Sequence, residues 1–302
     1  MTSGSGPNIA ASVRRRLLNR ARERGTDYNL VLLRYLNERL LYRLSQSLHR
    51  DAFILKGAMA FDLWIGTEYR PTRDIDFLGH GTNEPDAMES TFREILSTRV
   101  EPDGVEFDID SIETQRMAVG EPYPGVRVRV DANLGGARIK LHIDVGFGDA
   151  VSPAPRLASF PTLLDFPAPE IRAYPPETIV AEKFEAMVDL GIANTRLKDF
   201  YDVWLLADTI PFDGQALSSA VRTTFIRRGT RTPVEVPLAL SDVFAQDTAK
   251  LQQWEAFVRR SGLEEVPPLA SVIEALRAFL VPMISVSDKD LGQWDPEAWA
   301  WS

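Results

Sequence analysis

Two aspartates one residue apart, Asp74 and Asp76, have the residue type and spacing in this sequence that point most directly to chemistry. On a β-strand, residues i and i+2 point to the same face, so the two carboxylates project together while Ile75 and Phe77 face the core. Paired carboxylates repel each other unless a cation or a basic partner joins them. A hard divalent ion such as Mg²⁺ takes oxygen ligands and still leaves room for phosphate oxygens. The spacing therefore predicts a metal site.

A glycine turn upstream of this pair adds a place for phosphate. Gly57 follows the apolar segment 52–55, which predicts a strand, and it opens a short predicted helix. Backbone N–H groups at the start of a helix attract anions. Lys56 is able to reach a phosphate or neutralise the aspartates, although a lysine also commonly ends a strand. A phosphate cradle beside paired carboxylates indicates nucleotide chemistry.

Asp144 is a candidate third carboxylate, on a strand predicted over 137–145. Alternation divides that strand into an apolar face and a polar face, the first with Ile139, Leu141, Ile143 and Val145, the second with Lys140, His142 and Asp144. Three aspartates on neighbouring strands could hold two Mg²⁺ ions, which would activate an attacking hydroxyl and steady the displaced phosphate oxygens. The alternative is that Asp144 only starts the turn at Gly146.

A second candidate group lies far along the chain, in two predicted helices. Lys183 offers a mobile charge suited to a triphosphate. In the next helix Lys198, Asp199 and Asp202 are spaced so that all three can share one face. An intrahelical ion pair would explain the same spacing, and spacing by itself favours that simpler interpretation.

The bulk composition limits the classes of protein. The chain has 302 residues, 44% of them hydrophobic and 25% charged, as is ordinary for globular proteins, and no cysteine, which excludes disulfides and thiolate chemistry. It shows no apolar run of membrane-spanning length and no signal-peptide pattern, so we expect a cytoplasmic protein with no membrane partner. A net charge of −9 argues against bulk coating of nucleic acid. Two arginine groups could bind an RNA backbone or be solvated helix faces: Arg14, Arg15, Arg16, Arg20, Arg22 and Arg24, and Arg222, Arg227, Arg228 and Arg231.

Periodicity predicts three parts of the chain. Residues 1–48 carry two helices, 12–24 and 28–48. Residues 49–170 hold strands at 52–55, 74–78, 105–112, 126–131 and 137–145, with a helix at 84–97 and a hairpin turn at Gly135-Gly136. A proline-rich connector, 151–177, marks the boundary to residues 171–302, with helices at 177–190, 194–208, 213–227, 241–261 and 267–281 and a Trp-containing tail.

Several runs of residues in the same order resemble the AbiEii/AbiGii-type nucleotidyltransferase toxins, members of the polymerase-β-like nucleotidyltransferase superfamily. The runs are FILKGA (53–58), RPTRDID (70–76), KLHIDVGFGD (140–149), AEKFEAM (181–187) and NTRLKDFYD (194–202), together with the basic first helix and ERLL (38–41). The resemblance spans roughly residues 12–210. It implies an α+β fold with two lobes, in which a polymerase-β-like core (a mixed sheet with helices) joins an α-helical C-terminal lobe and the site lies in the cleft between them.

The resemblance also implies roles for the candidate residues. The turn Gly57-Ala58 would hold the triphosphate, and Lys183 and Asp199 would contact the nucleotide or support the site, with Asp202 as the alternative acid. In many nucleotidyltransferases this turn is Gly-Ser or Gly-Gly; with Ala58 here, only backbone N–H groups remain for the phosphate. The expected catalytic residues are Asp74, Asp76, Lys183 and Asp199, the expected nucleotide-binding residues are Lys56, Gly57, Ala58, Lys183 and Lys198, and the expected metal ligands are Asp74, Asp76 and Asp144.

The function that the resemblance implies is that of a toxin with an adjacent cognate antitoxin. We expect a monomeric Mg²⁺-dependent nucleotidyltransferase, with Mn²⁺ as the alternative ion, which moves a nucleoside monophosphate from an NTP to an acceptor. Some family members add pyrimidine nucleotides to the 3′ end of tRNA and block translation, so tRNA is the expected acceptor. The alternatives are a protein hydroxyl, a small molecule such as an antibiotic, or an NTP-binding module that makes no bond.

Overall fold

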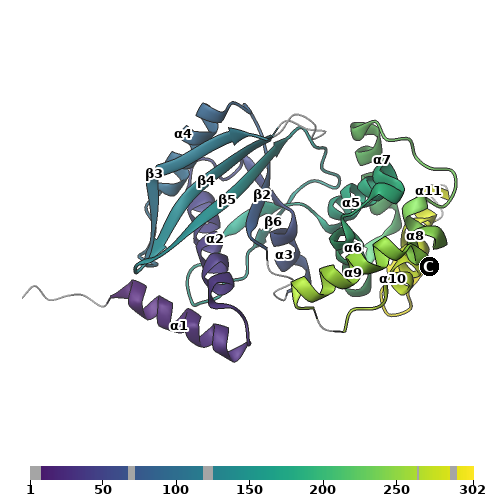
Figure 1. The fold of residues 1–302 in the computed structure, drawn as a ribbon. Helices are drawn as coiled ribbons and strands as arrows, with labels where there is room; N and C mark the ends of the chain where they lie inside the picture. The colour runs from purple at the N-terminus through teal and green to yellow at the C-terminus, as the bar shows by residue number, and fades with distance from the viewer. Residues whose placement is uncertain (1–7, 67–71, 118–124, 264, 286–290) are drawn as a thin grey trace, which may run out of the picture. The chain divides into compact units, whose positions relative to one another are not determined.

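The computed structural model describes residues 8–66, 72–117, 125–263, 265–285 and 291–302. Arg70 and Pro71, part of the family-like run 70–76, lie outside these residues. Within them the chain forms two compact units (Figure 1). The first unit comprises 8–66, 72–148 and 157–173, and the second comprises 149–156 and 174–302.

A mixed seven-stranded sheet organises the first unit, and the prediction of a mixed sheet with helices is confirmed. Its strand order is β3-β4-β5-β2-β1-β7-β6. The strands are β1 Phe53–Lys56, β2 Asp74–Gly79, β3 Val105–Arg116, β4 Gly125–Leu134, β5 Ala137–Phe147, β6 Arg156–Ser159 and β7 Glu170–Ala173. Strand β2 lies between β5, which runs parallel to it, and β1, which runs antiparallel. The predicted hairpin is present, since β4 and β5 pair antiparallel across Gly135-Gly136.

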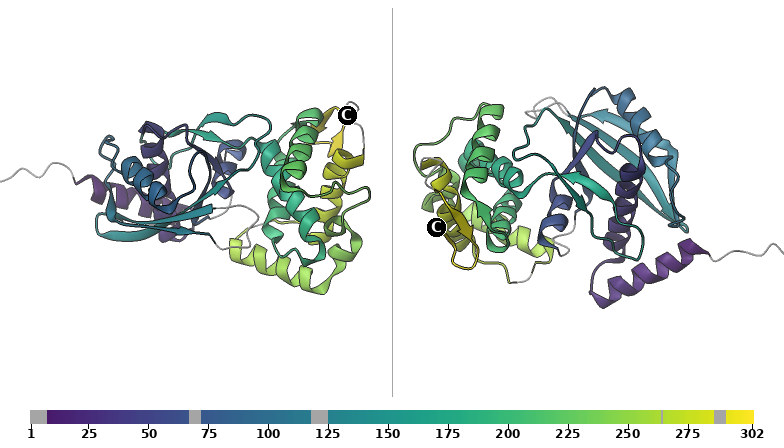
Figure 2. Two further views of the ribbon diagram at one scale, coloured as in Figure 1. Left: turned by 90° about the horizontal axis from the view of Figure 1, so that it is seen from above. Right: turned by 180° about the vertical axis from the view of Figure 1, so that it is seen from behind.

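The sheet has one apolar and one polar face over β2 and β5. Ile75 and Phe77 are fully buried, as are Leu141, Ile143 and Val145 on β5. Helices α2 (Tyr28–Gln46) and α4 (Pro85–Leu96) lie along the same side of the sheet, and α4 contributes Phe92, which packs against Phe53 of β1 (Figures 1 and 2). Burying one face fixes strand register, because a slip of one residue would turn every side chain over. The candidate carboxylates are thereby held on the opposite, polar face.

Of the two N-terminal helices, α1 is held by a narrow apolar stripe and α2 by buried charge. Helix α1 (Ile9–Glu23) buries only its Val13, Leu17 and Ala21 stripe. On α2, Arg43 binds both carboxylate oxygens of the buried Asp103, at 2.8 and 3.2 Å, and Tyr35 donates to the Asp103 carbonyl at 2.8 Å. Burial, the largest effect, raises the pKa of the neighbouring Glu38 despite Arg39 beside it. A charge buried without its partner is costly, so these pairs hold α2 in one position.

The proline-rich connector, which the sequence predicts as a boundary without strands of its own, also contributes two strands to the sheet. It contains β6 and β7, which extend the sheet, and β7 runs parallel to β1 with Leu55 opposite Ala173. Prolines are tolerated next to short or edge strands because they interrupt no central hydrogen-bond ladder there. The proline signal therefore marked the ends of two strands too short to show alternation.

The second unit is mainly helical. Its helices are α5 Pro176–Leu190, α6 Leu197–Thr209, α7 Gly214–Arg228, α8 Asp242–Gln246, α9 Thr248–Ser261, α10 Leu269–Leu280 and α11 Pro282–Ser285. The helix predicted over 241–261 is two helices, because Asp247 is extended and caps α9 by accepting from the Lys250 N–H at 2.9 Å. Helix α6 starts three residues later than predicted, after the extended Asn194.

The C-terminal tail is packed on the second unit. Strands β8 (Phe212–Asp213), β9 (Gln293–Asp295) and β10 (Ala300–Trp301) form a three-stranded sheet that the sequence did not predict. Trp294 is fully buried against Phe279, and its indole N–H donates to the Ala207 carbonyl at 2.7 Å. None of the helices in the described residues is long and apolar enough to cross a membrane.

Candidate active site

The turn at Gly57 lies directly against the carboxylate of Asp76. Gly57 has φ of +66°, which favours glycine, and it leads from β1 into the 3₁₀ turn Ala58–Ala60 and then α3 (Phe61–Ile65). A Cβ at this position would lie 2.0 Å from Asp76 Oδ2. Both the backbone angle and the space therefore require glycine, and the requirement comes from a predicted site residue.

Four charged residues form a row across the polar face of the sheet. Strand register places Lys56 opposite Asp76, Asp76 opposite Asp144, and Asp144 opposite Arg127 of β4. Residues directly opposite each other in a sheet share a face and interact. The row, called the charged row below, therefore runs cation, carboxylate, carboxylate, cation over β1, β2, β5 and β4.

The Lys56 side chain extends past Asp76, the residue opposite it on β2, as far as β5. Its Nζ would lie 3.6 Å from a Cβ placed on Gly146 of β5, two residues beyond Asp144 and on the same face. The missing side chain at Gly146 leaves room for the ammonium group over β2 and β5. The predicted nucleotide-binding lysine thus lies beside the predicted metal-binding carboxylates.

The other end of the charged row is a bidentate ion pair. Arg127 Nε and Nη2 bind Asp144 Oδ1 and Oδ2, each at 2.6 Å. These hydrogen bonds raise the pKa of the Arg127 guanidinium, and the charges of Asp144, Asp74 and Asp76 act in the same direction. Asp144 is nearly buried, at 13% side-chain exposure, so water screens this pair only in part.

Asp74 lies beside the charged row, two residues before Asp76 on β2. It is opposite His142, whose Nδ1 is 3.5 Å from Asp74 Oδ1, and its carboxylate is 43% exposed. Asp74 and Asp76 therefore share the polar face as predicted. Two adjacent carboxylates, one of them open to solvent and the other against a glycine cradle, are oxygen donors of the kind that Mg²⁺ takes.

A metal site that includes Asp144 stays a prediction. Within the described residues, no group of three or more His, Cys, Asp or Glu side chains is placed to hold a metal ion. The two carboxylates on β2 stay candidate ligands for a divalent ion, whereas Asp144 already has both oxygens on Arg127.

Helix α3 is fixed by a residue of α2. Arg34 Nη2 lies 2.9 Å from Asp62 Oδ2 in the first turn of α3, and the guanidinium stacks 4.3 Å from the centre of the Phe160 ring. Because α3 follows the Gly57 turn by only a few residues, this ion pair also restrains the cradle.

Lys183 in the second unit bridges two buried aspartates. Its Nζ lies 2.6 Å from Asp199 Oδ1 and 2.7 Å from Asp202 Oδ2, which come from α6, while Arg196 lies 2.9 Å from Asp199 Oδ2. Lys198 is exposed. The aspartates thus have an interhelical partner, which the spacing along one helix could not show.

The two aspartates differ in acidity. Burial, the largest effect, would raise the pKa of Asp199, but Lys183 and Arg196 outweigh it and hold that pKa below its ordinary value. Burial raises the pKa of Asp202 well above its ordinary value. Neither of these acids is free in this structure to act without disturbing the bridge to Lys183.

Comparison with protein families decides the identity. The model of the family described as nucleotidyl transferase AbiEii toxin, type IV toxin–antitoxin system, matches residues 39–280. The chain belongs to this family of nucleotidyl transferase toxins. Membership confirms the resemblance seen in the sequence and implies a cognate antitoxin.

Solved structures similar to this AbiEii-family chain are distant in sequence. JHP933 from Helicobacter pylori is 16% identical over 80% of this chain and 88% of its own, with a TM-score of 0.47. A provisionally described nucleotidyltransferase from H. pylori is 15% identical over 80% of this chain and 97% of its own, with a TM-score of 0.39. No curated protein sequence matches the chain.

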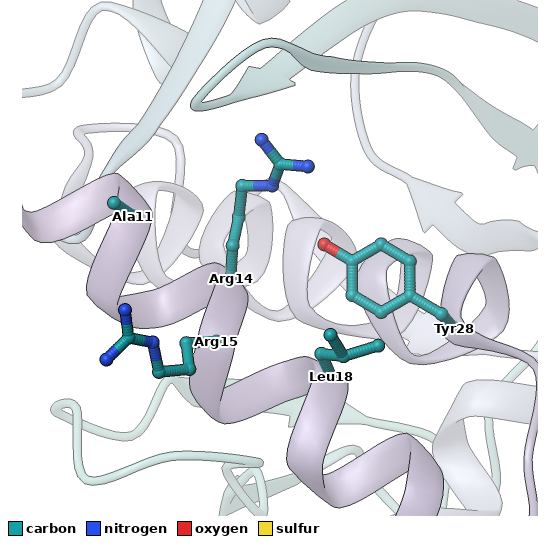
Figure 3. A pocket seen from close by; sticks show the side chains of 5 residues that line it. All are labelled: Ala11, Arg14, Arg15, Leu18 and Tyr28. Atoms are coloured by element: carbon teal, nitrogen blue, oxygen red, sulfur yellow. The ribbon is translucent and has the colours of Figure 1, made fainter.

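The α1–α2 hairpin of this AbiEii-family chain carries a pocket of about 320 Å³. It is lined by Ala11, Arg14, Arg15, Leu18 and Tyr28 (Figure 3). Arg14 and Tyr28 extend toward the same space, and Arg15 points outward (Figure 3). The Tyr28 hydroxyl is buried and has no hydrogen-bond partner in the part of the chain described.

The later arginine group does not behave as one surface. Arg228 is largely buried on α7, with Nη1 2.8 Å from a Glu185 carboxylate oxygen and Nη2 3.6 Å from Asp149. An arginine held among carboxylates supports the helices rather than an RNA backbone. Both helices carry exposed arginines, Arg222 and Arg227 on α7 and Arg14, Arg15 and Arg22 on α1, and α1 is the one that also lines the pocket beside Tyr28.

Sequence reasoning missed two residues of the polar face, Arg127 and Gly146. Arg127 lies in an alternating segment, Val126–Asp131, so its face could be predicted but not its partner on β5. From the sequence, Gly146 is only the glycine of a possible turn that Asp144 would start. In both cases the missing information was the register between strands.

Proposed function

We propose that this AbiEii-family chain is a Mg²⁺-dependent nucleotidyltransferase whose toxicity comes from moving a nucleoside monophosphate from an NTP to an acceptor hydroxyl. The hydroxyl attacks the α-phosphate and gives up its proton to solvent, the bond from the α-phosphorus to the oxygen of the β-phosphate breaks, and pyrophosphate leaves. The observation that carries the proposal is the fit of Gly57 against Asp76, in which a backbone turn free of Cβ adjoins paired carboxylates. This arrangement suits a triphosphate held beside a divalent cation.

The β2 carboxylates, Lys56 and the Gly57-Ala58 turn each have a proposed task. Asp74 and Asp76 would hold Mg²⁺, which when bound supplies positive charge to the phosphate oxygens. Lys56 would neutralise negative charge on the triphosphate, because its ammonium group extends from β1 over the polar face toward Gly146 of β5. The Gly57-Ala58 turn would bring backbone N–H groups to the phosphate, without a hydroxyl at Ala58. A polymerase-β-like core is the fold that this proposal implies.

RNA is the acceptor that we propose, with the 3′ end of tRNA as the specific target. Support comes from α1, where Arg15 and Arg22 are exposed and the adjoining pocket combines Arg14 with the aromatic ring of Tyr28. Single-stranded nucleic acids bind surfaces that pair cationic side chains with aromatic rings. Arginines on α1 would then contribute backbone contacts, which depend on salt but little on sequence.

Incubation with each labelled NTP and total RNA, followed by gel analysis, tests the proposal. We expect label in the tRNA band, lost in Asp76→Asn, since that change removes a metal-binding charge while keeping size. Label that enters protein or an added aminoglycoside, but not RNA, would show that the acceptor is that molecule and not RNA. Persistent toxicity of Asp76→Asn together with lost NTP binding would show that transfer is not the function.

Acceptor binding has its own measurement. Arg15→Gln should weaken binding of labelled tRNA and reduce the slope of log affinity against log salt by about one contact. A matched change in the second unit, Arg231→Gln, should alter neither. Equal effects of the two changes would remove α1 from the proposal and leave the transferase assignment intact.

A further inference from the structure

Both carboxylate oxygens of Asp144 are held by an arginine in this structure. Arg127 is directly opposite it on β4, and both of its hydrogen bonds, at 2.6 Å, are shorter than is usual for an N–H donor. A bidentate arginine occupies the two oxygens of a carboxylate in one plane. A metal ion that took Asp144 as a ligand would have to bind the remaining lone pairs next to a guanidinium charge, or displace Arg127.

From its position in the charged row, Arg127 interacts electrostatically with other carboxylates besides Asp144. The charged row places its guanidinium beyond two consecutive carboxylates, Asp144 and Asp76, and Asp74 also contributes to its electrostatic environment. At the opposite end Lys56 supplies the second cation. Two positive groups thus already balance the two carboxylates within the charged row, before any metal ion is added.

We propose that Arg127 is a positioning residue that withholds Asp144 from the metal site and serves as the fixed cation at that end of the charged row. This inference rests on the proposed function. The divalent ion is then held by Asp74 and Asp76, and Asp144 acts through Arg127 rather than as a ligand. Opening the pair would convert a two-carboxylate site into a three-carboxylate site.

A double-mutant cycle on Mn²⁺ affinity tests the inference. Free Mn²⁺ is counted by electron paramagnetic resonance in the presence of a fixed amount of non-hydrolysable NTP analogue. In the otherwise unchanged chain, Asp144→Asn leaves the Arg127 charge without its partner, so it should weaken Mn²⁺ binding only through a repulsion that high salt reduces. Arg127→Met should tighten Mn²⁺ binding by about tenfold, since it frees a carboxylate beside the ion.

The combined variant separates release of Asp144 from simple loss of a positive charge. Arg127→Met with Asp144→Asn should lose the tenfold gain, whereas a gain that persists would mean that Arg127 repels the ion without gating Asp144, and would overturn the inference. A loss of affinity in Asp144→Asn alone that stays undiminished at high salt would overturn it as well, since Asp144 would then be a ligand already. Arg127→Lys keeps the charge but not the bidentate geometry, and should give part of the gain if Arg127→Met fails to fold.

A reference variant distinguishes this inference from the proposed function. Asp76→Asn should weaken Mn²⁺ binding by more than tenfold in every background. An unchanged Mn²⁺ affinity in Asp76→Asn would remove the metal site itself, and with it both proposals. Normal dependence on Asp76 with a contrary result for Asp144 would remove the role of Arg127 and nothing else.

Discussion

Replacing Lys183 by methionine tests whether this family-motif lysine is structural. The side chain keeps nearly the same length but loses the charge that joins Asp199 and Asp202, which are 1% and 0% exposed. Removing one partner of a buried ion pair typically costs about 3–5 kcal/mol, because the remaining charge is left buried. Here Arg196 still pairs with Asp199, and Asp202 is able to take up a proton. We therefore expect about 3 kcal/mol, the lower end of that range.

Hydrogen exchange of the α5 and α6 amides at increasing urea concentrations measures this loss of unfolding free energy. A change of 3 kcal/mol should lower the melting temperature by roughly 6–12 °C for a unit of this size. Lys198→Met is the matched control: the lysine is exposed, and surface changes of this kind stay within about 0.5 kcal/mol.

The loss should also depend on pH, in a direction fixed by Asp199. Burial is the largest effect on the pKa of this carboxyl and would raise it, but Lys183 and Arg196 hold it below its ordinary value, so the stability that this pair contributes is present above the unfolded pKa and is lost as pH falls through the folded pKa. The Lys183→Met variant should therefore be closest to the unchanged chain in acid and furthest from it at neutral pH. Destabilisation below 0.5 kcal/mol at neutral pH would refute the reasoning. A stable variant that loses NTP transfer would instead assign Lys183 to the chemistry, as the family resemblance implies.

Three further changes have defined outcomes. Gly57→Ala should abolish binding of a fluorescent NTP analogue, because φ of +66° with ψ of −157° is a backbone conformation almost restricted to glycine, at a cost of about 1–3 kcal/mol, and the added Cβ would lie 2.0 Å from Asp76 Oδ2. Arg43→Met should lower the free energy of unfolding of the first unit by about 3–5 kcal/mol, measured in urea, since Asp103 would stay buried without its partner. Trp294→Phe should cost about 1 kcal/mol in a melting experiment, because it removes a hydrogen bond to a carbonyl near the end of α6.

Each of these outcomes has a counterpart that would contradict it. Ala58→Gly, one residue from the cradle, should bind the analogue normally; equal losses at both positions would mean that the whole turn was disturbed. Full stability of Arg43→Met would show that Asp103 finds water or another donor. A loss in Trp294→Phe several times larger than 1 kcal/mol would point to packing, not to the hydrogen bond.

The alternating pattern of single strands could be predicted well, because a period of two is written in consecutive residues. It placed Asp74 and Asp76 on the polar side of β2, and Asp144 on the polar side of β5. What it could not give was which residue lies opposite which on another strand. Arg127 and Asp144 are separated by 17 positions across a hairpin, and their pairing depends on a register set by the turn.

Helical spacing failed for a related reason. Lys198, Asp199 and Asp202 can share a face, and an intrahelical pair is the simplest consequence of that spacing. The structure instead joins both aspartates to Lys183, which is 16 and 19 positions away on another helix. Short strands were missed because four residues, as in β6 and β7, cannot establish a period. The Trp-containing strands escaped notice because their partner, β8, has only two residues.

The path of the chain through its two units has a consequence for synthesis. All four strands of the charged row have been made once Phe147 is complete, but β7, which pairs with the outer side of β1, ends only at Ala173. In between, residues 149–156 belong to the second unit. A nascent chain stopped after residue 148 would hold every polar residue of the row and yet present β1 as an unpaired strand edge. Such edges attract other chains, so a truncated toxin would aggregate before it could act.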